Sequence, residues 1–354
     1  MKIDLVYLWV DGSDPAWQKK KNAALAASAR PLTAFATRPK KFMENGELKY
    51  SLRSALKFAP WINHIYIVTD AQCPAWLAAH PRVTIVDHSV ILPKAALPSF
   101  NSNAKELFLW KIPGLSEHFL YANDDMFFGA DVSPDFFFDA NGNPIVIVKE
   151  RNQAAAFRTH YAPRDGRHRM FFHKIQTAVN LVWKTFGKKY NIAFKHAIEP
   201  MRKAYLRENF EQFEDLFLKT TATSFREYTN IQRIVFPALD NAKGRNTLVL
   251  NWRLALPQKI CDFLGTPGGT RRIVYHPNDS WVRRAGHSIL WVIAMIFGLS
   301  KYDCYDKQAG LIKHIKKYRP SLFAINEFAH DGDAFAHASE LMNEMFPKKS
   351  EFEK

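Results

Sequence analysis

Cysteine is scarce in this chain of 354 residues, and its three cysteines, Cys73, Cys261 and Cys304, stand far apart. Their spacing matches neither a disulfide framework nor a set of metal ligands. We therefore expect free or buried thiols and a reducing compartment. The chain also lacks internal repeats and low-complexity linkers, which favours one composite unit over a string of independent domains.

An apolar run long enough to span a bilayer is also missing. The N-terminal run is broken by Asp4 and Asp11, so we expect it to be the first strand of the fold and not a signal peptide. Near the other end, residues 289–299 (ILWVIAMIFGL) form an unbroken apolar run between Arg284 and Lys301. Its eleven residues are too few for a membrane span. A buried helix explains this run, and so does a helix lying in a membrane interface.

Acidic residues are under-represented. Lys and Arg number 49 against 34 Asp and Glu, which gives a formal charge of +15. Such an excess favours an anionic partner: a nucleic acid, a nucleotide, a phosphorylated sugar or a membrane surface. Solubility alone would also explain it. No helix-turn-helix, zinc-finger or aromatic RNA-binding signature is present, so we expect no nucleic acid as partner.

The first 150 residues alternate between short β-rich runs and helical patterns. Each β-rich run is bounded by Asp, Asn, Pro or Gly, and the runs are IDLVYLWV, HIYIVTD, VTIVDH, HFLYAND and PIVIV. Helices are predicted between them, over residues 48–58, 74–79 and 102–112. This alternation predicts an α/β fold with a mostly parallel sheet of Rossmann-like or glycosyltransferase-like topology and helices on both faces. Ligands bind at the carboxyl ends of the strands in such sheets.

The remaining chain changes in texture. Residues 151–260 are rich in Arg, Lys and His and carry long helical patterns, for example over 172–186 and 200–217. We predict three parts: an α/β core (1–150), which binds the ligand, a helical insertion (151–260), and a mainly helical C-terminal part (261–354) that includes the apolar helix 289–299. A short strand is expected at IVYH, residues 273–276.

Acidic side chains cluster at three predicted strand ends: Asp11 with Asp14, Asp70, and Asp124 with Asp125. The last pair stands inside the apolar stretch FLYANDDMFFG, where two adjacent carboxylates need a positive partner. A hard cation such as Mg²⁺ or Mn²⁺ suits them, since it takes oxygen ligands and bridges them to a diphosphate. A capped loop would explain the pair as well, and an Asx turn would explain DGSDP.

Three further features are ambiguous by themselves. FNSN at residues 100–103 places small polar groups at a helix start, where backbone N–H groups favour phosphate, although Ser102 would also serve as a plain N-cap. His196 has the side chain best suited to accept a proton, and Arg226 can contact phosphate through two hydrogen bonds. Without further information, both would be surface residues.

Four blocks of the chain together resemble the Stealth family of sugar-phosphate transferases. They are DLVYLWVDGSDPAW; ENGELKYSLRSALKFAPWINHIYIVTDAQCPAWL with LPSFNSNAKELFLWKIPGLSEHFLYANDDMFFG; KHAIEPMRKAYL with TSFREYTNI; and PSLFAINEF with MFPKKSEFEK. This family includes bacterial capsule phosphotransferases and the N-acetylglucosamine-1-phosphotransferase that begins the mannose-6-phosphate tag on lysosomal enzymes. In the fourth block, Glu327 stands where the family usually has Asp.

The resemblance implies the roles of ten side chains and one further metal ligand. Asp124 and Asp125 would hold Mg²⁺ or Mn²⁺, with Glu327 as a further metal ligand. Arg226 would stabilise phosphate charge, and His196 would act as general base. The donor pocket would be lined by Asp11, Asp14, Arg53, Asn101, Ser102 and Asn326.

The implied reaction transfers a sugar-1-phosphate from a UDP-sugar to a hydroxyl of a glycan acceptor and leaves a phosphodiester, as in capsular or cell-surface polysaccharide synthesis. A metal-dependent glycosyltransferase that releases UDP is the alternative, because it would use the same carboxylates. The positive charge would then bind the anionic product, or dock the enzyme on the inner face of the cytoplasmic membrane beside capsule export machinery. A cytoplasmic location is expected.

Overall fold

The computed structural model describes residues 1–28, 32, 34–37, 42–150, 167–188, 192–194, 197–227, 230–250, 273–275, 315, 321–325 and 332–354. Its strands are β1 (Ile3–Leu8), β2 (Ile65–Thr69), β3 (Val83–Asp87), β4 (His118–Asn123), β5 (Met126–Phe128), β6 (Ile145–Glu150), β7 (Ile192–Phe194), β8 (Glu199–Arg202), β9 (Thr247–Leu250), β10 (Ile273–Tyr275) and β11 (Leu322–Ala324). Its α-helices are α1 (Pro15–Ala26), α2 (Ala34–Thr37), α3 (Glu47–Phe58), α4 (Ser102–Glu106), α6 (Arg167–Phe186), α7 (Lys203–Gln212), α8 (Glu214–Thr221), α9 (Val235–Ala242) and α13 (Gly332–Met345).

The central sheet has the strand order β3-β2-β1-β4-β8. Strands β1 to β4 run parallel, with Leu8 opposite both Val68 and Asn123, and β8 closes the edge antiparallel to β4. This arrangement confirms the predicted α/β class and the mostly parallel sheet. Because β1, β2 and β4 end at the same level, the loops that follow them meet at one edge of the sheet.

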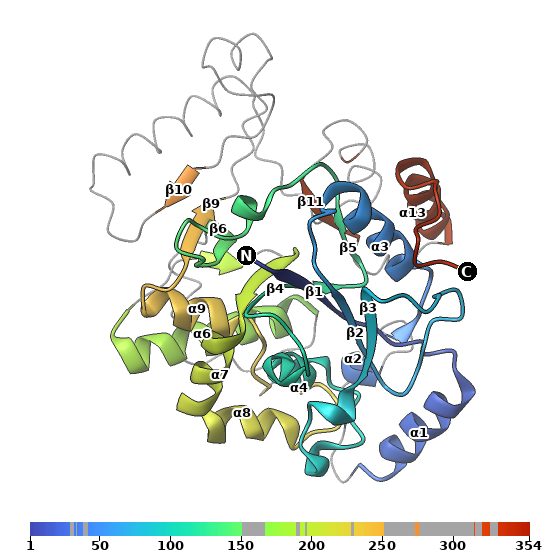
Figure 1. Ribbon diagram of the computed structural model, residues 1–354. Helices are drawn as coiled ribbons and strands as arrows, with labels where there is room; N and C mark the ends of the chain where they lie inside the picture. The colour runs from blue at the N-terminus through green and yellow to red at the C-terminus, as the bar shows by residue number, and fades with distance from the viewer. Residues whose placement is uncertain are drawn as a thin grey trace, which may run out of the picture.

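Helices cover both faces of this sheet. Figure 1 shows α3 and α13 on one side and α4 with α6 to α9 on the other. The pleat of the strands explains this division, because neighbouring residues point to opposite faces. Val6 and Val68 pack in the core beneath α4 and α7, whereas Leu5 and Ile67 pack in the core beneath α3.

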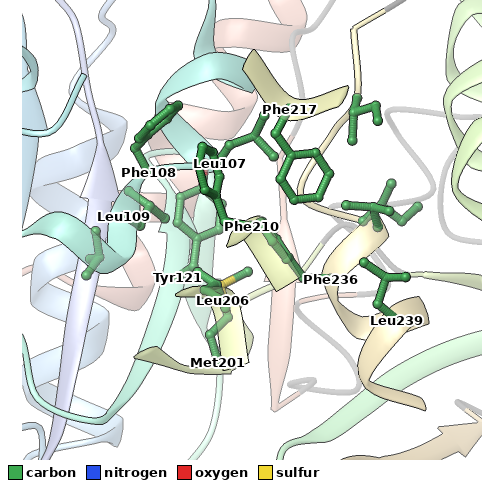
Figure 2. Close-up of a cluster of buried hydrophobic side chains, with 14 of the residues drawn as sticks. Leu107, Phe108, Leu109, Tyr121, Met201, Leu206, Phe210, Phe217, Phe236 and Leu239 are labelled. Atoms are coloured by element: carbon green, nitrogen blue, oxygen red, sulfur yellow. The ribbon is translucent and has the colours of Figure 1, made fainter. Parts of the chain in front are cut away.

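The larger core is strongly aromatic. Figure 2 shows Phe108, Tyr121, Phe210, Phe217 and Phe236 packed together. Tyr121 lies on β4, Phe108 lies in the turn after α4, and the other three lie on α7, α8 and α9. The rings of Phe108 and Phe210 have their centroids 4.7 Å apart, and those of Phe217 and Phe236 lie 5.5 Å apart. These contacts tie the helices after residue 203 to α4 and β4, so both parts of the chain can contribute side chains to one site.

Two smaller sheets extend the structure. The first has four strands in the order β10-β9-β6-β7. Within it, β6 and β9 run parallel, β10 is antiparallel to β9, and β7 is antiparallel to β6. Strand β11 pairs antiparallel with β5, directly after the two Asp residues. The predicted strand at IVYH is confirmed by β10. The three-part division of the chain stays a prediction, and residues 289–299 lie outside the described residues.

Several predicted helices need correction. Residues 74–79 are not helical: the backbone N–H of Ala78 donates to Phe352 O at 2.8 Å, so this segment pairs with the C-terminal residues instead. The helix predicted over 102–112 ends as α4 at Glu106, and a 3₁₀ turn follows at Leu109–Lys111. In the pattern over 200–217 the first residues belong to β8, because they pair with β4. The helices over 48–58 and 172–186 are confirmed by α3 and α6.

Candidate active site

Acidic side chains gather where β1 and β4 end. Asp124 and Asp125 directly follow β4, and Asp11 lies in the loop after β1. Burial, Asp125, Glu47 and Glu44 together raise the pKa of Asp124 well above its usual range. Burial also raises the pKa of Glu44, and Glu47 and Asp11 add to this effect. The site therefore concentrates negative charge, which either a proton on Asp124 or a bound cation would relieve.

A close backbone contact brings Glu44 and Glu47 to this edge. The N–H of Gly12 donates to Phe42 O at 2.6 Å. A Cβ atom at position 12 would stand 2.2 Å from that same oxygen, so only glycine permits the contact. The segment that starts at Phe42 and leads into α3 is thereby fixed beside the DGSDP loop. Composition and spacing gave no sign of Glu44 and Glu47 as site residues.

The DGSDP loop is itself well ordered by hydrogen bonds. Asp14 caps α1 by accepting from the N–H of Ala16 at 2.8 Å, and its second oxygen accepts from Gln72 Nε2 at 2.9 Å. The bond from Gln72 and the backbone bonds lower the pKa of Asp14. Asp11 accepts from both the N–H and the hydroxyl of Ser13, an Asx-type turn. Both carboxylates thus shape the loop at the end of β1.

The oxygen-rich set fits a hard divalent cation. Among the described residues, no group of three or more His, Cys, Asp and Glu side chains could hold a metal ion alone. Mg²⁺ does not need such a group, since it is commonly bound by one or two carboxylates together with waters and substrate phosphates. Asp124 and Asp125 fit that role, since burial and neighbouring carboxylates raise the pKa of Asp124 and a bound cation would oppose that effect. Glu327 lies outside the described residues.

Positive charge stands on the neighbouring part of the same edge. The guanidinium of Arg226 donates to Ser102 Oγ on α4. Lys20 on α1 forms an ion pair with the buried Asp70, which follows β2. His88 Nε2 lies 3.5 Å from the same oxygen of Asp70, and burial, with Lys105 as the next cause, lowers the pKa of His88 to about 4.

The FNSN motif fixes the loop that carries Arg226. Asn101 is fully buried, and its Nδ2 donates to Asn230 Oδ1 at 2.9 Å and to Thr220 O at 3.2 Å. The N–H of Phe100 donates to Ser224 O at 2.7 Å, and its ring stacks on Phe225 with centroids 5.1 Å apart. The motif therefore positions Arg226. Asn101 itself has its amide nitrogen turned to protein acceptors, and its role in lining the donor pocket stays a prediction.

A buried polar network connects the same helix to the acidic pair. The hydroxyl of Tyr121 donates to Glu106 Oε1 at 3.0 Å and to Asn123 Oδ1 at 2.7 Å. Arg233 forms an ion pair with Glu199 and stands over the ring of Tyr121, 4.7 Å from its centroid. Burial and Glu106 raise the pKa of Tyr121, so the phenol stays protonated. The residue before Asp124 is thus held from α4.

Arg53 lies elsewhere. Its guanidinium donates to both oxygens of Glu353, at 2.7 and 2.6 Å, and to Phe346 O at 2.8 Å. All these contacts are with the C-terminal segment, and the structure does not join Arg53 to the acidic pair. Its place in the donor pocket stays a prediction. His196 and Asn326 lie outside the described residues; Ile325, the residue before Asn326, donates through its N–H to Asp125 O at 2.9 Å.

Two family models match the chain over residues that build this site. Residues 1–29 match the model of Stealth protein CR1, conserved region 1, and residues 41–146 match that of Stealth protein CR2, conserved region 2. The chain belongs to the Stealth family. The two Stealth regions contain Asp11, Asp14, the FNSN motif and the acidic pair.

Curated relatives carry names from polysaccharide synthesis. The chain is 38% identical over 232 residues to the exopolysaccharide phosphotransferase CpsY of Mycobacterium tuberculosis, which covers 65% of this Stealth chain and 42% of that protein. It is 34% identical over 247 residues to the capsular polysaccharide phosphotransferase cps1A of Actinobacillus pleuropneumoniae, covering 69% and 66%. The capsular polysaccharide phosphotransferase LcbA of Neisseria meningitidis is 33% identical, with 66% and 63% covered. The alignment to CpsY thus spans only about two fifths of that relative.

Solved structures resemble the chain only distantly. The galactosyltransferase LgtC aligns with a TM-score of 0.36 at 11% identity, over 70% of this chain and 73% of its own. The glycosyltransferase GlyE of Streptococcus pneumoniae aligns with a TM-score of 0.39 at 10% identity, over 98% and 64%.

None of the helices within the described ranges is both long and apolar enough to cross a membrane.

Proposed function

We propose that this Stealth chain transfers a sugar-1-phosphate from a UDP-sugar to a hydroxyl of a glycan acceptor, in the synthesis of a capsular or exported polysaccharide. One observation carries the proposal: a carboxylate pair and a fixed arginine stand at the same edge of a parallel sheet, where nucleotide ligands bind. The names of the relatives support the reaction class. UDP as carrier and the phosphodiester product are part of the proposal.

The reaction joins the acceptor oxygen to the phosphorus that bears the sugar, and the bond from that phosphorus to the oxygen of UMP breaks. The anomeric C–O bond survives. Charge develops on the phosphoryl oxygens, so positioned cations are the main source of catalysis. Arg226 supplies a forked donor, whose position the bond to Ser102 fixes. His196 takes the proton of the acceptor hydroxyl in this proposal, and Asn326 contacts the donor.

Asp124 and Asp125 would hold a divalent cation, with Glu327 as a further candidate ligand. Mg²⁺ or Mn²⁺ would supply charge neutralisation on the donor diphosphate there. The crowded carboxylates around Asp124 give this assignment its physical basis, since Glu44 and Glu47 add negative charge without taking part as ligands in the proposal. The formal charge of +15 suits an anionic phosphodiester glycan. Contact with a membrane surface and with export machinery stays a prediction.

The released nucleotide tests the proposal. The purified chain is incubated with a panel of UDP-sugars, Mg²⁺ and oligosaccharide acceptors of capsule type, with and without EDTA, and nucleotides are separated by chromatography. We expect UMP that depends on both metal and acceptor, together with a phosphodiester signal in the ³¹P NMR spectrum. The variant Asp124→Asn should release none, and Asp131→Asn, which changes an exposed carboxylate, should match the wild type. Release of UDP would instead identify glycosyl transfer and refute the proposal.

A further inference from the structure

Lys105 stands beside Arg226 without a described partner of its own. It lies on α4 three residues after Ser102, so both side chains leave the helix on the same side, toward the guanidinium that Ser102 holds. The side chain is half-buried. Within the described ranges, no hydrogen bond and no ion pair is formed by its ammonium group. Lys105 is thus a long cation close to a second cation, and within the described ranges its ammonium group pairs directly with no carboxylate.

The charges around Lys105 come from four neighbouring segments. Asp70 and Asp87 face it from the ends of β2 and β3, Lys20 from α1, and Arg226 from the loop after α8. Asp70 is already engaged by Lys20 and lies 3.5 Å from His88. Burial is the largest cause that lowers the pKa of Lys105, to about 8, and Arg226 and Lys20 add to it while the two carboxylates oppose it.

The balance of charge here is positive. Three cations, Lys20, Lys105 and Arg226, face the two carboxylates of Asp70 and Asp87. His88 adds no charge, because its lowered pKa keeps it neutral at pH 7. An unpaired half-buried cation is unfavourable unless an anion completes the site. Lys contributes a point charge and Arg a planar fork, and phosphate groups are bound well by this combination.

We propose that Lys105 and Arg226 together form the subsite that binds the diphosphate of the nucleotide donor. The nature of the anion rests on the proposed function, but the binding of a phosphate anion at this pair does not. The geometry thus assigns a role to Lys105, which follows the FNSN motif on α4 and lies close to Arg226, the partner of Ser102. Lys105 then acts as a phosphate-binding residue on the side of the donor opposite to the carboxylate pair.

Calorimetric titration of the full chain with inorganic pyrophosphate in EDTA tests this subsite apart from turnover. At pH 7 we expect Lys105→Met to weaken binding about tenfold to a hundredfold, the range for loss of one charge-assisted contact. Lys105→Arg should stay within about threefold of the wild type, because it keeps the charge. Lys111→Met is the matched control, since Lys111 is exposed and stacks on Phe108 and Trp110 five residues after α4.

The pH dependence separates a phosphate contact from a structural one. Binding requires protonated Lys105, so wild-type affinity should fall relative to Lys105→Arg as pH rises above about 8. Pyrophosphate ionises alike for all variants, and the ratio of the two affinities removes that effect. Above the pKa the ratio should change by up to about tenfold per pH unit.

Two results would overturn the subsite. One is wild-type affinity in Lys105→Met; the other is a ratio of wild type to Lys105→Arg that stays constant from pH 7 to pH 9. A lower Tm of Lys105→Met with unchanged pyrophosphate affinity would show that Lys105 only balances Asp70. These readouts do not depend on turnover: if the chain releases no UMP, the proposed function fails, while loss of pyrophosphate binding in Lys105→Met would still establish the phosphate subsite.

Discussion

The guanidinium of Arg226 donates to the hydroxyl of Ser102, 124 positions earlier in the chain. Around this bond, Asn101 holds the backbone that surrounds Arg226, and Phe100 stacks on Phe225. The FNSN motif at the start of α4 therefore holds in place a loop from the helical part of the chain. Its polar groups look suited to bind a substrate, yet most of them bind protein.

The isosteric change Asn101→Asp tests whether Asn101 holds this loop. It would turn a buried carboxylate toward the acceptor oxygens of Thr220 and Asn230, which now receive hydrogen bonds from Nδ2. We expect a loss of about 3 kcal/mol in the free energy of unfolding, since the oxygen that replaces Nδ2 would face acceptors only, while the other oxygen keeps its bond from the N–H of Asn103. Urea denaturation measures it. Wild-type stability in this variant would mean that the loop is not held by Asn101.

The milder change Ser102→Ala separates positioning from folding. It removes a single partly exposed hydroxyl, which is the acceptor of Arg226, so the free energy of unfolding should change by less than about 1 kcal/mol. Turnover should fall about tenfold or more, because the guanidinium loses its fixed direction. Steady-state kinetics with circular dichroism checks both. Equal turnover in Ser102→Ala and wild type would contradict the role given to Arg226.

The acidic pair should show a conflict between stability and activity. The raised pKa of Asp124 means that the folded state binds a proton more tightly than the unfolded chain does, so this group makes stability fall as pH rises from the ordinary Asp range through the raised pKa. Asp124→Asn removes that penalty. In EDTA its Tm should exceed that of the wild type, by more at pH 8 than at pH 5, while turnover drops at least about a hundredfold.

Thermal unfolding with added Mg²⁺ completes this test. A cation that balances Asp124 should raise the Tm of the wild type at pH 8, and should raise it less at pH 5, where protons compete for the same oxygens. Asp124→Asn should not respond. Asp131→Asn, an exposed carboxylate, is the control and should respond as the wild type does. An equal Mg²⁺ response in all three proteins would refute the metal assignment.

Much of the sheet could be predicted because its strands are short apolar runs bounded by turn residues. The acidic cluster followed from the same pattern, since Asp11 and Asp124 stand directly after two such runs. The helix predicted over 74–79 was wrong because the partner of this segment, Phe352, lies far away in the chain. A local pattern cannot show that a short segment will bond to a distant part of the chain, and such tertiary pairing overrides local preference.

The second half of the site was hidden for a related reason. Glu44 reaches the acidic pair only through the contact of Gly12 with Phe42, and Lys105 is notable only because Arg226 lies beside it. A lysine on a short helix ordinarily reads as a solvated surface residue. What marks these residues is the balance of charge in three dimensions, which spacing along the sequence does not encode.

Arg53 offers a test of a sequence prediction against the geometry. Hydrogen bonds from Arg53 and Ser350 lower the pKa of Glu353 to about 2, although burial opposes this. A depressed pKa contributes stability that is complete above the ordinary Glu range and is lost as pH falls toward 2. Arg53→Met should cost about 3 kcal/mol of unfolding free energy at pH 7, because it leaves a buried carboxylate unpaired.

The cost of Arg53→Met should shrink as pH falls below about 4.5, where Glu353 can accept a proton in the variant. Urea denaturation at pH 7 and pH 3.5 measures this. If the side chain lined the donor pocket instead, the KM for the donor would rise with little change in stability. The bidentate pair with Glu353 predicts the reverse: a large loss of stability, and a KM near that of the wild type in the protein that stays folded.

The hydroxyl of Tyr121 links α4 to the residue before the acidic pair, and its removal should be felt in turnover. Tyr121→Phe keeps the buried ring and its contact with Arg233 but leaves Glu106 and Asn123 without their shared donor. We expect a loss of about 1 to 2 kcal/mol in unfolding free energy from the unpaired acceptors. Turnover should fall about tenfold, since Asn123 no longer fixes the backbone that presents Asp124.

The matched control is Tyr66→Phe, which removes the hydroxyl of a buried tyrosine in the same core, on β2, a strand that leads to Asp70 and not to the acidic pair. It should leave turnover unchanged. The affinity for pyrophosphate should also stay unchanged in Tyr121→Phe, because Ser102 holds Arg226 and the Tyr121 hydroxyl bonds to neither cation. If Tyr121→Phe lost stability but kept wild-type turnover, the network would serve only to pack Arg233 and Glu106, and the acidic pair would be positioned by its own turn.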